Sequence, residues 1–187
     1  LLVIPLLEKR VSAWEMLRNW GVVYVGNLFG GVLVAELATY SHIYEMFDGE
    51  LLKTVLLTAW SKGQLSFGDT LLRGSFCNLL VCLAIWLSLA ARDAVGKIAG
   101  LYLPVLLFVL CGFEHCVANM YYIPAGILAK SNPSYIAKAL ELGVNHSAID
   151  SLNWCTMFTS NLIPVTLGNI VGGAGLVGCV YWYVYKK

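Results

Sequence analysis

Apolar residues fill three long stretches of the chain, at residues 20–40, 71–91 and 162–185. Each stretch has about the twenty residues that an α-helix needs to cross a hydrocarbon core roughly 30 Å thick. A fourth apolar stretch covers residues 98–129. A continuous helix of that length would extend roughly 48 Å, which is too long for one straight crossing. The pattern therefore predicts an all-α membrane protein with three continuous spans and a fourth that is broken.

The break in the fourth stretch is predicted near residues 112–118, where Glu114 and His115 lie among apolar neighbours. Pro124 marks a second weak point. An ionisable residue at the bilayer centre costs on the order of 3 kcal/mol, and such residues usually face a partner, a cavity or a pathway. Glu114 and His115 are therefore candidate site residues. The competing interpretation is a histidine whose ring bonds a backbone carbonyl within a helix bundle.

Composition agrees with a membrane protein, because 59% of the residues are hydrophobic and only 12% are charged. The mean hydropathy is +0.74. A basic run or face that would bind nucleic acid is missing from the sequence, so we expect no such partner. The three histidines are not spaced as a metal or haem site requires. We therefore expect no metal, no cofactor and no enzyme activity.

Lysine and arginine are distributed unequally between the two sides that these spans define, which favours a cytoplasmic C-terminus. The predicted cytoplasmic side holds Lys9, Arg10, Arg18, Arg92, Lys97, Lys186 and Lys187, against Lys53, Lys62, Lys130 and Lys138 on the other. The two outer connections, residues 41–69 and 130–160, are long and hold most of the acidic residues. In the second connection, a partial apolar face after Asn132 and Pro133 predicts a short amphipathic helix.

A six-residue pattern, GNxxGG, occurs twice, as GNLFGG at 26–31 and GNIVGG at 168–173. The two copies lie on spans that run in opposite directions, which indicates an inverted repeat. VIPLLEK at 3–9 also resembles YIPAGILAK at 122–130. Inverted repeats with broken helices are typical of channels and transporters. Close helix packing through small residues is the alternative explanation of the glycines, and both can hold together.

The repeat also predicts what the sequence lacks. Two segments precede the second GNxxGG helix, whereas a fragment ending near Leu7 precedes the first. We therefore expect the N-terminal part to be missing and the native protein to contain about six spans. Residues 1–187 are interpreted as a single transmembrane channel domain whose first half-repeat is incomplete.

Three motifs resemble the formate/nitrite transporter family, which includes formate, nitrite and hydrosulfide channels. They are GFEHCVANM followed by MYYIPAGI, RGSFCNLLVCLAIW at 73–86, and NLIPVTLGNIVGG at 161–173. The resemblance covers about residues 4–186. It implies an aquaporin-like protomer of six spans in the bacterial inner (plasma) membrane, assembled as a homopentamer with one pore per subunit.

The same resemblance implies roles for individual residues. His115 matches the central pore histidine, which meets the permeating anion between two apolar constrictions. Phe108 matches an aromatic position of the outer constriction, and Asn78 matches a pore-facing amide. The supporting residues are Glu114, Asn119 and Asn169, with Lys62 as the lysine of the family's site. Lys62 and Arg73 are both predicted near the outer mouth, where cations raise the local anion concentration.

The predicted function is therefore passage of small monovalent weak-acid anions, namely formate, nitrite or hydrosulfide, with protons as a further expected partner if transport is proton-linked. A histidine that donates a hydrogen bond or a proton can neutralise such an anion in an apolar pore. An aquaporin-like channel for neutral solutes is the alternative. It is disfavoured because the sequence contains no NPA motif and has Glu114 and His115 at the expected midplane.

Overall fold

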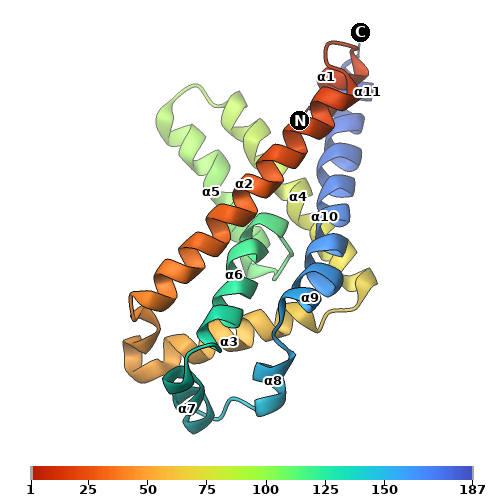
Figure 1. Cartoon of the computed structure of the whole chain (residues 1–187). Helices are drawn as coiled ribbons and strands as arrows, with labels where there is room; N and C mark the ends of the chain where they lie inside the picture. The colour runs from red at the N-terminus through yellow and green to blue at the C-terminus, as the bar shows by residue number, and fades with distance from the viewer. Residues whose placement is uncertain (1, 187) are drawn as a thin grey trace. The chain divides into compact units, whose positions relative to one another are not determined.

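The computed structural model describes residues 2–186, and every regular element in that part of the chain is helical (Figure 1). In chain order the elements are α1 (Val3–Leu7), α2 (Ala13–Tyr40), η1 (Ile43–Gly49), α3 (Glu50–Gly63), α4 (Phe67–Ala90), α5 (Ala94–Leu110), α6 (Cys116–Ala129), α7 (Pro133–Glu141), α8 (His146–Ser151), α9 (Trp154–Thr156), η2 (Met157–Leu162), α10 (Ile163–Ile170), η3 (Val171–Cys179) and α11 (Val180–Tyr185). Three helical stretches, Ala13–Tyr40, Phe67–Ala90 and Trp154–Tyr185, are long and apolar enough to cross a membrane.

Backbone contacts divide the chain into two compact units. The first unit comprises residues 1–22, 68–115 and 164–187, and the second comprises residues 23–67 and 116–163. The break predicted in the fourth apolar stretch is present at residues 111–115, between α5 and α6. His115 is the last residue of its segment in the first unit, and Cys116 begins a segment of the second.

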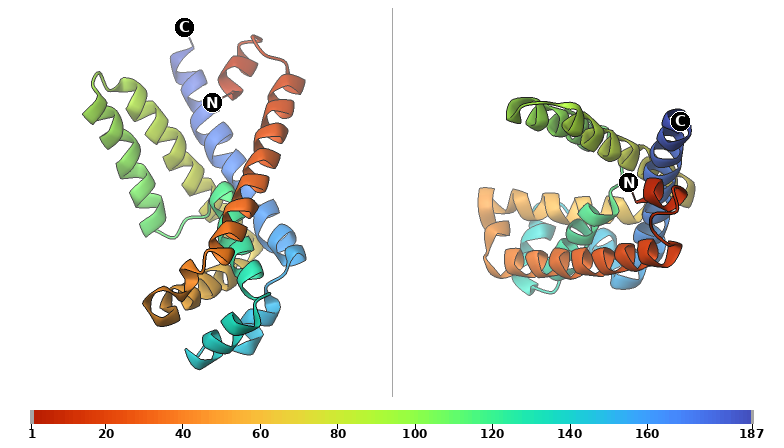
Figure 2. Two further views of the ribbon diagram at one scale, coloured as in Figure 1. Left: turned by 60° about the vertical axis from the view of Figure 1, so that its left-hand side comes forward. Right: turned by 90° about the horizontal axis from the view of Figure 1, so that it is seen from above.

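In the first unit, α4 and α5 form an antiparallel hairpin (Figure 2). Asp93 caps the start of α5, because its carboxylate accepts a hydrogen bond from the Gly96 N–H over 2.8 Å. The two helices approach closely at Gly100, where an added Cβ would lie 3.1 Å from the Leu87 backbone. Glycine at this position therefore brings the hairpin together.

Glycines of the second GNxxGG motif produce a second close approach in the same unit, between α4 and the stretch formed by α10 and η3. A Cβ on Gly168 would meet the Leu71 carbonyl oxygen, and one on Gly172 would meet the Ser75 carbonyl oxygen. Small residues allow two membrane helices to pack backbone against backbone. For this motif, the close-packing explanation is correct.

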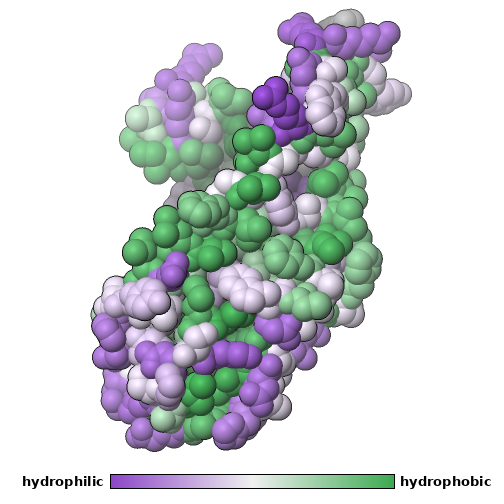
Figure 3. Space-filling view, in the orientation of Figure 1, coloured by the Kyte–Doolittle hydropathy of each residue, from purple (hydrophilic) through white to green (hydrophobic). Residues whose placement is uncertain are grey.

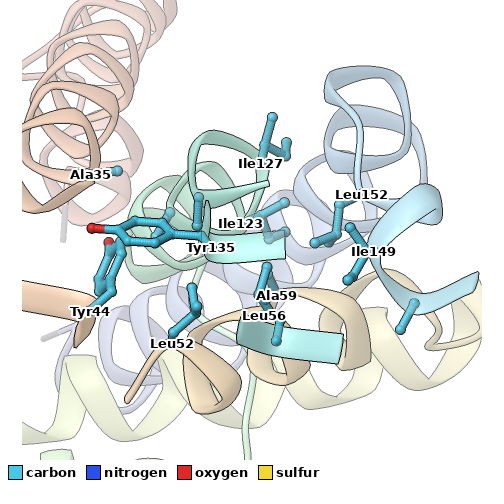
Figure 4. Packing of buried hydrophobic residues seen from close by; sticks show 14 of the residues in the cluster. Ala35, Tyr44, Leu52, Leu56, Ala59, Ile123, Ile127, Tyr135, Ile149 and Leu152 are labelled. Atoms are coloured by element: carbon cyan, nitrogen blue, oxygen red, sulfur yellow. The ribbon is translucent and has the colours of Figure 1, made fainter. Parts of the chain in front are cut away.

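In the second unit, the core packs α3 against α6 (Figure 4). Leu52, Leu56 and Ala59 are buried on α3 and meet Ile123 and other apolar residues of α6. α3 is a 14-residue helix within the 41–69 connection, where the sequence pattern predicted no helix. The spacing of its buried residues, four and then three positions apart, is that of one helix face.

Two tyrosines extend this core toward α7. The rings of Tyr44 and Tyr135 pack edge to face, with centroids 6.2 Å apart (Figure 4). The amphipathic helix predicted after Asn132 is present as α7. The side-chain amide oxygen of Asn132 accepts from the Ser134 N–H, and Pro133 is the first helical residue.

Pro124 does not end α6, so its prediction as a weak point was wrong. A proline within a helix leaves the carbonyl four residues earlier without its usual donor. That carbonyl belongs to Met120, and the backbone of α2 approaches it at Gly31, where an added Cβ would lie 2.5 Å from the oxygen. α6 thus continues through the proline with this carbonyl packed against the backbone of α2.

Hydrophobic side chains cover much of the surface of α2 (Figure 3). Its exposed apolar residues include Val22, Val25, Phe29, Val34 and Leu37. An apolar face of this size suits contact with lipid or with other membrane helices.

Candidate functional site

The site is built around the helix break at residues 111–115. α5 ends in a Schellman motif: the Phe113 N–H donates to the Phe108 carbonyl over 3.0 Å, and the Gly112 N–H donates to the Val109 carbonyl over 3.1 Å. Gly112 has a φ of +64°, a left-handed conformation that glycine adopts without steric cost. The glycine thus turns the chain out of α5 immediately before Glu114.

Backbone groups of Glu114, which a helix would normally pair, find partners on neighbouring elements. Its N–H donates to the Arg73 carbonyl over 3.4 Å. Its carbonyl accepts from the Asn169 side-chain amide over 3.0 Å. Irregular backbone within a membrane protein requires such partners, because lipid supplies none.

Asn169 is the centre of this arrangement. Its side-chain amide donates to the carbonyls of Gly74 and Glu114, over 2.9 and 3.0 Å. Its own backbone carbonyl accepts from the Asn78 amide over 2.6 Å. Asn169 is 5% exposed, so these bonds are protected from competing water. One residue of the GNIVGG motif therefore connects α4, α10 and the break.

His115, which is half-buried, follows Glu114 directly and packs its ring against Phe108. The ring centroids are 5.9 Å apart with an interplanar angle of 26°. Phe113 makes a similar stack with Phe76 of α4, at 5.6 Å and 29°. The two aromatic pairs place the histidine against α5 and the preceding turn against α4.

Two predicted site residues, Lys62 and Asn119, lie in the second unit and are connected through Asn161. The Asn119 side-chain amide donates to the Asn161 oxygen over 2.7 Å, and the Asn161 amide donates to the Lys62 carbonyl over 2.9 Å. Both asparagines are completely buried. The Lys62 ammonium lies 5.5 Å from the ring centroid of Tyr122.

Most predicted site residues therefore fall into two groups. His115, Phe108, Glu114, Asn78 and Asn169 come together in the first unit, and Lys62 and Asn119 in the second. Arg73 contributes its backbone carbonyl to the first group, while its side chain is exposed. Among the described residues, no group of three or more histidine, cysteine or acidic side chains could hold a metal ion.

Asn161 was missing from the predicted site. A single asparagine at the edge of an apolar stretch has no periodic partner, so its sequence context does not identify it. The available signal was its position at the start of the NLIPVTLGN motif, eight residues before Asn169. Both asparagines lie on the same long helical stretch, and both are buried.

The two GNxxGG motifs differ in their surroundings. Asn27 donates to the Val23 carbonyl of its own helix, and within the described residues nothing lies within 4 Å of a Cβ added at Gly26 or Gly30. In the second motif, Gly168 and Gly172 each meet the backbone of α4. The repeat is therefore visible in the sequence, but its two copies make different contacts.

Comparison with known proteins assigns the family. Residues 1–183 match the formate/nitrite transporter family. Formate channel FocA of Escherichia coli K12 is 38% identical over 189 residues, which cover 100% of this chain and 65% of FocA. The uncharacterized transporter YrhG of Bacillus subtilis is 37% identical over 185 residues, which cover 98% of this chain and 61% of YrhG.

Two solved channel structures are similar to this chain. A pentameric formate channel with formate bound superposes with a TM-score of 0.85 at 39% identity, over 95% of this chain and 69% of that chain. An ion channel of the same family gives a TM-score of 0.78 at 26% identity, over 98% of this chain and 65% of that chain. These matches confirm the predicted fold class.

The chain belongs to the formate/nitrite transporter family and is a multi-pass membrane protein. It spans 61% of YrhG and 65% of FocA. These relatives are named as channels or transporters, in agreement with the expectation that the protein is not an enzyme.

Proposed function

We propose that the protein of which this chain is part passes small monovalent weak-acid anions across the plasma membrane, and that the anion meets His115 on the way. The observation that carries the proposal is the packing of the His115 ring against Phe108, at a helix break whose backbone is fixed by Asn169. This arrangement offers one polar ring beside an apolar one.

The chemistry favours a weak acid over a permanent anion. An apolar passage disfavours a charged solute that has lost its water. A histidine can donate a hydrogen bond or a proton, since its charge changes near neutral pH. Formate, nitrite and hydrosulfide each have an accessible neutral form, so each could cross as the acid and leave as the anion. Chloride has no such form and is expected to pass less well.

Assembly and orientation belong to the same proposal. We expect a homopentamer, because the similar solved structure is described as pentameric. A cytoplasmic C-terminus is part of the proposal, and the distribution of lysine and arginine supports it. Asn78 and Phe108 are proposed to line the path, Lys62 and Arg73 to attract anions, and Glu114, Asn119 and Asn169 to support the site.

The test is flux into proteoliposomes that contain the full-length protein. Formate, nitrite, hydrosulfide, chloride and glycerol are compared at two pH values. We expect one or more weak-acid anions to pass, with chloride and glycerol far slower. Equal passage of glycerol would instead support the neutral-solute channel, and absence of all flux from correctly assembled protein would refute a transport role.

His115→Asn tests the part assigned to the histidine. Asparagine keeps a hydrogen-bond donor but does not titrate near neutral pH. We expect flux through the variant to lose the pH dependence of the wild type. A variant that retained the wild-type pH profile would exclude protonation of His115 from the mechanism.

A further inference from the structure

Asn161 is a fully buried amide in η2, between two residues already assigned to the proposed site. We propose that Asn161 is a positioning residue, which fixes Lys62 and Asn119 relative to one another so that the Lys62 ammonium is held where it attracts anions. The inference rests on the proposed function for its transport consequence, whereas the positioning itself can be measured separately.

Hydrogen bonding is the first argument. Asn161 accepts from the Asn119 amide over 2.7 Å and donates to the Lys62 carbonyl over 2.9 Å. Its side chain therefore uses its oxygen and its nitrogen at the same time, on two different elements. A buried amide that lost either bond would retain its desolvation cost, so this geometry is strongly preferred.

The end of α3 supplies the second argument. The last carbonyls of an α-helix have no intrahelical donor and need other partners. α3 ends at Gly63, where the Gln64 N–H satisfies the Ser61 carbonyl and the Asn161 side chain satisfies the Lys62 carbonyl. The backbone of Lys62 is thus held by a residue that lies 99 positions later in the chain.

A third argument comes from α6. Asn119 and Tyr122 are three residues apart, so they lie on the same face of that helix. Asn119 bonds Asn161, and the ring of Tyr122 lies 5.5 Å from the Lys62 ammonium. One face of α6 therefore contacts both ends of Lys62, its backbone through Asn161 and its ammonium through an aromatic ring.

η2 also has an unusual backbone. It is a π-helix over Met157–Leu162, with Asn161 near its end. Single π turns within α-helices are often found at functional sites, because the extra residue redirects the side chains that follow. Here the wider turn coincides with the buried asparagine that reaches α3.

The experiment uses full-length protein in proteoliposomes and measures initial formate flux against formate concentration. Asn161→Leu removes both hydrogen bonds. Asn161→Asp is nearly isosteric, keeps the acceptor for Asn119, and loses the donor for the Lys62 carbonyl. The comparison set is completed by Lys62→Met and by the double variant Lys62→Met/Asn161→Leu.

Asn153→Ala is the matched control. Asn153 accepts from the Thr156 N–H over 2.9 Å and caps α9, so its side chain serves a local turn in the same part of the chain. The control therefore reports the effect of losing an asparagine that has only a local structural role. We expect its half-saturating formate concentration to stay within about twofold of the wild type.

If Asn161 acts through Lys62, both Asn161 variants raise the half-saturating formate concentration by about fivefold, with little change in maximal flux. Lys62→Met raises the half-saturating concentration to a similar extent. The double variant has the same value as Lys62→Met alone, because the effects of substitutions in residues that act as one unit are not additive. Wild-type half-saturation in Asn161→Asp, or effects that multiply in the double variant, would overturn the inference.

A second measurement does not depend on transport. The rate at which an amine-reactive reagent acylates Lys62, relative to Lys53, is followed by mass spectrometry of the folded protein in detergent. We expect Asn161→Leu and Asn161→Asp to raise this ratio, and Asn153→Ala to leave it unchanged. An unchanged ratio in the Asn161 variants refutes the positioning role, whereas wild-type protein that passes no anion refutes only the proposed function.

Discussion

The side-chain amide of Asn169 donates to the backbone carbonyl of Glu114 over 3.0 Å, although the two residues are 55 positions apart. The same amide reaches the Gly74 carbonyl over 2.9 Å. A broken membrane helix exposes backbone groups that lipid cannot satisfy. Asn169 supplies the missing partner from a neighbouring element, and in doing so fixes the residue that precedes His115.

Replacing Asn169 should therefore destabilise the protein through the break. Asn169→Leu removes both donated bonds, and we expect a loss of about 1–3 kcal/mol, seen as a lower melting temperature of the full-length protein in detergent. Asn169→Asp should be worse, because a carboxylate would face two carbonyl oxygens. The control Asn19→Leu makes the same asparagine-to-leucine substitution at an exposed helix position and should leave the melting temperature almost unchanged. Equal melting of Asn169→Leu and the wild type would show that the break is held by other contacts.

Packing at the GNIVGG motif leads to a second prediction. Gly172→Ala places a methyl group against the Ser75 carbonyl, and overpacking of this kind costs about 1–3 kcal/mol. Gly175→Ala, three residues later in the same helical stretch, is the control, since nothing described lies within 4 Å of its added Cβ. Thermal unfolding should separate the two variants clearly. Two identical melting curves would mean that α4 and η3 can move apart without cost.

Gly112 allows a test of the turn itself. An L-residue in the left-handed conformation costs about 1–2 kcal/mol, so Gly112→Ala should lower the melting temperature and reduce flux by moving His115. Asparagine tolerates this conformation better, and Gly112→Asn should recover part of the loss. Gly21 lies within α2, where no described residue comes within 4 Å of an added Cβ, so the control Gly21→Ala should not destabilise the protein. Full activity and stability of Gly112→Ala would argue against a fixed turn.

Lys138 gives a prediction about pH. A hydrogen bond to Asp48 raises the pKa of Lys138, and the charges of Asp48 and Glu141 act in the same direction. The Lys138 ammonium lies 3.1 Å from the Asp48 carboxylate. Because the folded pKa is above the unfolded one, the stabilisation is present below the unfolded pKa of about 10.4 and is lost as pH rises through the folded value.

Lys138→Met should accordingly have a slightly lower melting temperature than the wild type at pH 8. This difference should shrink at pH 11. It should also shrink in 1 M salt, because the Debye length at that ionic strength is about 3 Å. Lys53→Met removes the ammonium of a looser pair, whose nitrogen and oxygen are 3.5 Å apart, and should have less effect. A difference for Lys138→Met that stays constant with pH and salt would assign the effect to packing of the lysine stem.

Parts of this structure could be predicted from the sequence, and the reasons are physical. The break at residues 111–115 was predictable because two ionisable residues interrupt an apolar stretch too long for one crossing. α3 was missed because Lys53 interrupts its short apolar run, which Glu50 and Lys62 flank, although Leu52, Leu56 and Ala59 have helical spacing. In a membrane sequence, the length and polarity of apolar stretches thus predict the spans more reliably than they predict the short helices that connect the spans.

The site was only partly predictable. Glu114 and His115 could be predicted as site residues because a charged side chain in lipid has an unfavourable free energy. Asn169, whose amide bonds the Glu114 carbonyl, was named only through the family resemblance, and Asn161 was missed. Hydrogen bonds such as Asn119 to Asn161 join residues 42 positions apart and have no periodicity. The π-helical segments η2 and η3 were also not predicted, and their residues show no simple periodic pattern.

The contact between α2 and α6 has a consequence for mutational scanning. Gly31 approaches the carbonyl of Met120, which is open because Pro124 cannot donate to it. Replacing Met120 with alanine leaves that oxygen in place, so a side-chain scan of α6 would not detect the contact at the residue that makes it. It would be detected instead at Gly31 on α2, where an added Cβ would lie 2.5 Å from the same oxygen.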